Sequence, residues 1–62
     1  MCESNAYLFT NGEEELLLEQ VAHIEPIEGG YRLSGLFGDE KEVKGRIHDI
    51  NLLKHKILFV EE

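Results

Sequence analysis

The sequence contains little cysteine and proline and no tryptophan: one Cys and one Pro stand among 62 residues. A single cysteine cannot form an internal disulfide, so a chain this short must find its stability elsewhere, in a metal or a partner chain. No apolar run approaches the roughly 18 residues that a membrane span needs. The start, Met-Cys-Glu-Ser-Asn, lacks the basic and apolar regions of a secretory signal peptide. We therefore expect a cytoplasmic protein, not a membrane protein, whose thiol stays reduced.

Catalytic and cofactor motifs are missing as well. The chain has no phosphate-binding glycine loop, no Cys-x-x-Cys pair, no His-Glu-x-x-His helix signature and no nucleophile elbow. Cys2 could meet a histidine in space to form a catalytic pair. However, so short a chain leaves little room for a substrate pocket, which usually measures about 300–1,000 Å³. We therefore predict that the protein is not an enzyme.

Acidic residues outnumber basic ones, and the net charge is −7. Residues 1–40 hold nine acidic residues and one basic residue, whereas residues 41–56 hold five basic and two acidic ones. Phosphate backbones repel such a chain, which disfavours nucleic-acid binding. We interpret the basic stretch as charge balance within or between subunits; a patch for RNA or for an acidic protein is the alternative. Its basic residues are Lys41, Lys44, Arg46, Lys54 and Lys56.

Short runs typical of strands alternate with turn residues along the whole chain. The predicted strands cover residues 5–10, 16–27, 31–37, 41–50 and 57–60, although residues 16–22 could also form a turn of helix. Residues 13–15 are expected in a solvated loop or at a strand edge. This spacing predicts an all-β fold, a small five-stranded antiparallel barrel that forms one domain over residues 1–62. Closing the sheet removes edges that would otherwise promote aggregation.

Side-chain alternation also predicts which residues face the core. Tyr31, Leu33 and Phe37 are expected to share one face of the third strand, and Val43 should point inward from the fourth. Gly45 lies in the middle of that fourth strand. Glycine at such a position indicates a bend or a bulge.

Cys2 is chemically distinctive because it lies beside the amino terminus. A metal bound by the Met1 amine, the Cys2 backbone nitrogen and the Cys2 thiolate closes two five-membered chelate rings; if Met1 is removed, the cysteine amine and thiolate still close one. A set of sulfur and nitrogen donor atoms in one plane favours Ni(II) or Cu(II) over Zn(II). A two-fold dimer could join two such sites and support a small core. A buried thiol without a role is an equally open interpretation, because spacing specifies no second ligand.

His55 is a weaker candidate ligand. It lies between two lysines in the connection before the last predicted strand, where a histidine is more often simply solvated. His23 and His48 fall at outward-facing strand positions and carry less weight.

Four segments together resemble a known protein family. They are Met1–Glu3, Val21–Pro26, Leu36–Gly38 and Ile50–Ile57. Their order and spacing resemble the CooT family of small nickel-binding accessory proteins linked to carbon monoxide dehydrogenase maturation. The resemblance implies a homodimer of SH3-like or Sm-like barrels that binds Ni(II). It also implies that the cysteine after the initiator methionine, here Cys2, binds the metal.

We therefore predict a nickel-binding accessory protein of the metallochaperone type, which holds or delivers Ni(II) for a nickel enzyme such as carbon monoxide dehydrogenase or for its maturation machinery. Cys2 would anchor the metal, with backbone nitrogen at Met1 and Cys2 as co-ligand. Two alternatives stay open. One is a small RNA-binding barrel that uses the basic stretch 41–56, and the other is a structural interaction module in which Cys2 is inert.

Overall fold

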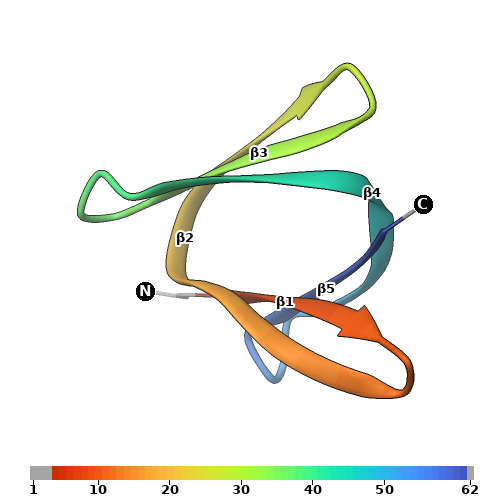
Figure 1. Ribbon diagram of the computed structural model, residues 1–62. Coiled ribbons are helices and arrows are strands. Elements are labelled where there is room, and N and C mark those ends of the chain that lie inside the picture. The colour runs from red at the N-terminus through yellow and green to blue at the C-terminus, as the bar shows by residue number, and fades with distance from the viewer. Residues whose placement is uncertain (1–3, 62) are drawn as a thin grey trace.

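The structure, a computed structural model, describes residues 4–61. These residues form five β-strands joined by turns. They are β1 (Ser4–Thr10), β2 (Glu13–Ile27), β3 (Gly30–Gly35), β4 (Glu40–Asn51) and β5 (Lys56–Glu61) (Figure 1). Within these residues, no helix has the length and apolar character needed to cross a membrane.

Backbone hydrogen bonds join the strands, in chain order, into a closed barrel. Each strand runs antiparallel to the next. The ring closes between β1 and β5, which are parallel, with Ala6 opposite Ile57. An odd number of strands with alternating direction leaves the first and last pointing the same way, so the closing pair has to be parallel. The predicted all-β five-stranded barrel is confirmed, and this parallel pair adds to it.

The two long strands bend, so that each pairs with a different neighbour on either side of the bend. β2 pairs with β1 up to Val21 and with β3 from Val21 onward. β4 pairs with β3 up to Lys44 and with β5 from Gly45 onward. Backbone φ is positive at both bends, 53° at Gln20 and 148° at Gly45. The bend predicted at Gly45 is therefore present, and a Cβ there would overlap the carbonyl oxygen of Val60.

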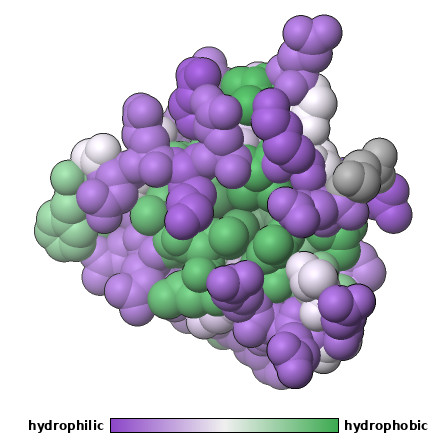
Figure 2. Space-filling view, in the orientation of Figure 1, coloured by the Kyte–Doolittle hydropathy of each residue, from purple (hydrophilic) through white to green (hydrophobic). Residues whose placement is uncertain are grey.

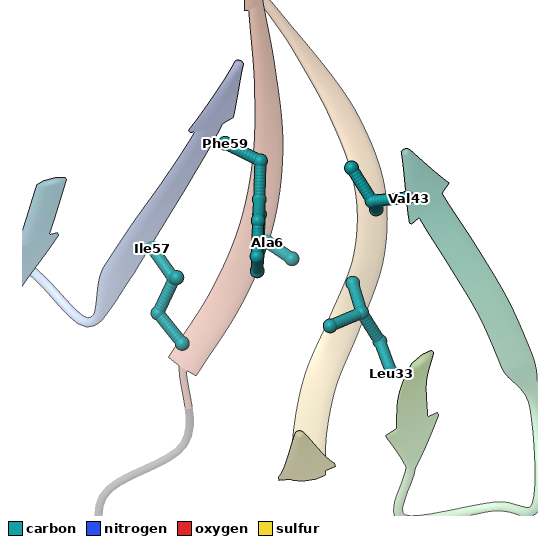
Figure 3. Packing of buried hydrophobic residues seen from close by; sticks show 5 residues of the cluster. All are labelled: Ala6, Leu33, Val43, Ile57 and Phe59. Atoms are coloured by element: carbon teal, nitrogen blue, oxygen red, sulfur yellow. The ribbon is translucent and has the colours of Figure 1, made fainter. Parts of the chain in front are cut away.

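The hydrophobic core is small. Its buried members are Ala6, Leu33, Val43, Ile57, Leu58 and Phe59, of which Ala6, Leu33 and Phe59 are fully buried. Figure 3 shows five of these side chains, contributed by β1, β3, β4 and β5, directed into the space between the strands. Figure 2 shows hydrophobic side chains gathered in the middle of one face and framed by hydrophilic ones. A domain of this size buries only about 60% of the surface of its unfolded chain, so its free energy of unfolding is expected to be small.

Two details differ from the sequence prediction. The third strand ends at Gly35 instead of residue 37, because the Gly38 amide donates a hydrogen bond to the Gly35 carbonyl oxygen (3.2 Å) and turns the chain. Phe37 consequently lies in the turn with 82% of its surface exposed, and its predicted place on the core face with Leu33 was wrong. Residues 13–15 are exposed as expected, but they form the first part of β2 and pair with β1.

Candidate metal centre at the start of strand β1

The predicted metal ligands Met1 and Cys2 lie outside the described residues, so the centre is characterised by what surrounds the start of β1. Ser4, two residues after Cys2, begins this strand. The backbone amide of Asn5 donates a hydrogen bond of 2.8 Å to the carbonyl oxygen of His55. The turn between β4 and β5 is therefore held against the first residues of β1.

The side chain of Asn5 joins the same point to the bend in β2. Its Oδ1 accepts a hydrogen bond of 3.0 Å from the Gln20 amide. Gln20 has left-handed backbone geometry, which costs a non-glycine residue about 1–2 kcal/mol. The Gln20 carbonyl oxygen in turn accepts a 3.0 Å hydrogen bond from the Leu36 amide. Four hydrogen-bonded segments thus meet here: the β4–β5 turn, the start of β1, the bend of β2 and the β3–β4 turn.

Replacing Asn5 by alanine is expected to destabilise the fold by about 1–3 kcal/mol, because the partly buried Gln20 amide loses its acceptor. Asn5→Asp keeps an acceptor oxygen at the same place and is the matched control. Urea unfolding followed by circular dichroism measures the effect. A loss of stability that is equal in both variants would show that the Asn5–Gln20 bond is not its cause.

The weaker candidate His55 lies in this turn with an exposed side chain and a positive φ of 55°. Its carbonyl oxygen, which holds Asn5, places the residue beside the amino-terminal end of β1. Among residues 4–61, no group of three or more His, Cys, Asp or Glu side chains is arranged to hold a metal ion.

The other two histidines are exposed, as predicted. The His48 ring stacks on Phe9, with ring centroids 5.5 Å apart and planes inclined by 1°. His23 lies in β2 opposite Ser34. His48 lies in β4 at the register shift between Ile47 and Asp49.

The basic stretch 41–56 takes part in two ion pairs with residues outside it. Lys56 Nζ lies 2.6 Å from Glu14 Oε1 and 5.3 Å from the centre of the Tyr7 ring. Glu42 lies in the same stretch, and its carboxylate pairs with Arg32 at 3.3 Å. These contacts support the interpretation of the stretch as charge balance within the chain.

Hydrogen bonding to Glu14 raises the pKa of Lys56 above its ordinary value of 10.5. Glu14→Gln should therefore lower the Lys56 pKa, which a titration of its side-chain NMR signals measures. Because the folded pKa is the higher one, the pair stabilises the fold fully below the ordinary pKa and loses this effect as the pH rises through the folded pKa. The stability difference between parent and variant should shrink above about pH 10.5. Glu13→Gln is the control, and a Lys56 titration unchanged by Glu14→Gln would contradict the assignment.

No sequence pattern points to the contact between Asn5 and Gln20. The two residues are 15 positions apart, and their contact exists only because β2 bends. Glutamine is not among the residues that favour left-handed geometry, so the residue type at position 20 does not predict a bend.

Comparison with known proteins agrees with this architecture. A family model described as "CO dehydrogenase accessory protein CooT" matches residues 1–59. An uncharacterized protein of Methanothermobacter thermautotrophicus is 40% identical over 62 residues, which is 100% of this chain and 92% of the relative. The crystal structure of a protein provisionally assigned as CooT, from Carboxydothermus hydrogenoformans, superposes with a TM-score of 0.91 at 38% identity and covers 98% of both chains.

The family match extends over nearly the whole chain, including Met1 and Cys2 and all of β1 to β4. An accessory protein assists an enzyme and is not itself the catalyst, which agrees with the prediction that this chain is not an enzyme. The chain belongs to the CooT family of carbon monoxide dehydrogenase accessory proteins.

Proposed function

We propose that this chain is a cytoplasmic nickel-binding accessory protein that holds or delivers Ni(II) for carbon monoxide dehydrogenase, with Cys2 as the anchoring ligand. The observation that carries the proposal is the family match over residues 1–59, because that range includes the single cysteine at position 2. The cargo follows from the ligand chemistry that the amino terminus offers.

Cys2 and Met1 supply the donors for this metal. The thiolate of Cys2 is soft, and the terminal amine and the Cys2 backbone nitrogen lie next to it along the chain, so all three can bind one ion through five-membered rings. Thiolate and planar nitrogen donors suit Ni(II), whereas Zn(II) gains nothing from a planar arrangement. Because the thiol must lose its proton to bind, affinity should rise with pH.

A site shared between two chains is the second part of the proposal. Two amino termini that meet on a two-fold axis offer two thiolates together with nitrogen donors, enough for a four-coordinate ion. The small core supports this arrangement, since only six hydrophobic residues among those described are buried. Domains below about 70–80 residues commonly rely on a metal or on oligomerisation for stability.

A Ni(II) titration followed by ultraviolet absorption tests the proposal. Thiolate-to-nickel charge-transfer bands should grow and saturate at one nickel for two chains, and competing Zn(II) should displace the nickel poorly. Saturation at one nickel per chain would overturn the shared site but leave Cys2 as the ligand. A titration without charge-transfer bands would overturn the nickel-binding role itself.

A further inference from the structure

The first half of β2 has one edge to which no other described strand is bound. β2 pairs with β1 over Glu13–Val21 and with β3 only from Val21 onward. The edge of residues 13–19 that faces away from β1 therefore has no strand partner among residues 4–61, and we call it the open edge. Figure 1 shows this part of β2 beside β1 at the lower border of the barrel. An exposed strand edge presents unpaired backbone donors and acceptors and is a template for another strand.

A comparable edge exists on β4, but it is less suited to a partner. β4 pairs with β3 only up to Lys44, so within the described part of the chain residues 46–51 also pair with one strand alone. The pairing of these residues with β5 is interrupted by a register shift between Ile47 and Asp49. Such irregularities bend a strand and protect its edge from further pairing. In β2, by contrast, residues 13–16 pair regularly with β1, and the register shift comes only after Leu16.

A shallow groove lies along the later part of the open edge. It has a volume of about 300 Å³, and its walls include five consecutive residues of β2, 16–20, together with Phe37 and Asp39 after β3. Side chains of a strand alternate between two faces, so a groove lined by consecutive residues runs along the edge of the strand and not over one face. An extended segment bound at the open edge therefore has apolar walls within reach.

The side chains of the open edge indicate which kind of strand would fit it. Glu13 and Glu15 are exposed and, by alternation, lie on one face of β2. Glu14 and Leu16 lie on the other face, where Glu14 already pairs with Lys56 and Leu16 is 47% exposed. A complementary strand would place basic side chains beside Glu13 and Glu15 and apolar side chains beside Leu16, because opposite charges and apolar pairs stabilise neighbouring strands.

We infer that the open edge binds an extended segment of another protein as an added β-strand, and that basic and apolar residues alternate in this segment. Main-chain hydrogen bonds supply the affinity of such a complex, and the alternating side chains supply its specificity. The inference uses only strand pairing and charge, so it does not depend on the proposed nickel site.

A second copy of this chain does not fit the open edge. An antiparallel register centred on Leu16 would put Glu19 opposite Glu13 of the partner subunit. Like charges directly opposite each other destabilise a strand pair. The excess of acidic residues along this edge therefore favours a basic partner over self-pairing.

The test uses the intact chain and a synthetic octapeptide of alternating valine and lysine, in about 0.15 M salt so that long-range attraction is screened. Amide hydrogen exchange followed by NMR should show new protection at those residues of the open edge whose amides point away from β1. Fluorescence anisotropy of the labelled peptide gives the dissociation constant. A peptide of the same composition in which all valines precede all lysines should bind about tenfold more weakly or worse, because it cannot match both faces at once.

Two charge reversals with the same effect on net charge separate the open edge from the acidity of the whole chain. Glu15→Lys should raise the dissociation constant of the alternating peptide about tenfold or more, because it places like charges side by side. Glu28→Lys, in the exposed turn between β2 and β3, is the matched control and should raise it less than about threefold. Both positions are exposed, so circular dichroism should show an intact barrel.

The opposite results overturn the inference. Equal weakening by Glu15→Lys and Glu28→Lys would show only a general attraction to an acidic chain. Failure of the alternating peptide to bind, binding without protection at residues 13–19, or equal binding of both peptides would show that no strand is added. Protection of the open edge before any peptide is present would show that the edge is already occupied, by a second copy if the protection grows with protein concentration. None of these results changes the nickel titration, so the proposed function is tested separately.

Discussion

Replacing Cys2 with serine is expected to abolish tight Ni(II) binding. The sulfur is the only soft anionic donor that the chain can offer, because no other cysteine exists. A serine hydroxyl stays protonated near neutral pH and is a poor ligand for a late transition metal. Even a group that only supports a metal ligand costs about 10–100-fold in affinity when it is lost, so removal of the thiolate should cost more than about a hundredfold.

Two measurements make this result specific. The charge-transfer bands in the ultraviolet should disappear in Cys2→Ser, and a competition titration should give the change in the nickel dissociation constant. His55→Ala is the matched control, since His55 lies beside the start of β1 but would bind through its imidazole alone. That variant should keep the bands and lose much less affinity. A Cys2→Ser protein that binds Ni(II) as tightly as the parent would refute the proposed function.

Replacing Gly45 with alanine is expected to unfold most of the protein at 25 °C. Gly45 lies at the bend of β4, where φ is 148° and where the strand changes partner from β3 to β5. Backbone strain of this kind costs a residue with a side chain about 1–3 kcal/mol. The overlap of the new Cβ with the Val60 carbonyl adds to this cost, because backbone and not a flexible side chain stands in the way. A core this small rarely supplies more than about 3–5 kcal/mol in total.

Gly12→Ala separates the two causes. Gly12 also has a positive φ of 81°, but a Cβ there would meet no atom within 4 Å. This control should lose only the conformational part, about 1–2 kcal/mol. Thermal and urea unfolding followed by circular dichroism compare the variants. If Gly45→Ala were as stable as Gly12→Ala, the close approach of β4 and β5 at this position would not constrain the fold.

The strands could be predicted because their signals are local. Turn dipeptides such as Asn11-Gly12, and alternation of apolar and polar residues over a few positions, need no knowledge of distant residues. The same local rule failed at Phe37, whose apolar character continued the strand pattern although the hydrogen bond between Gly38 and Gly35 ends the strand there. Residues 13–15 show the opposite case: their charge favoured a loop or a strand edge, but they pair with β1 as part of a strand. Charged residues are compatible with a strand whose outer face meets water.

The candidate site also has one part that local sequence predicts and one part that it does not. Cys2 and Met1 are neighbours in the chain, so their proposed role as joint metal ligands could be predicted from the sequence alone. The contacts at the start of β1 could not be predicted, because they join residues that are distant in the chain: Asn5 contacts Gln20 and His55, and Gln20 contacts Leu36. The contacts of Gln20 with Asn5 and Leu36 form at the bend in β2.

The strands, the charge reversal after residue 40 and the proposed role of the single cysteine, Cys2, follow from the order of the residues, because each depends on composition or on close neighbours. Closure of the barrel through the parallel pair of β1 and β5 depends on the fold, as do the hydrogen bonds that join the start of β1 to His55 and, through Gln20, to Leu36. Such contacts join residues far apart in the chain, and their geometry exists only once Gln20 and Gly45 have turned the two long strands toward new partners.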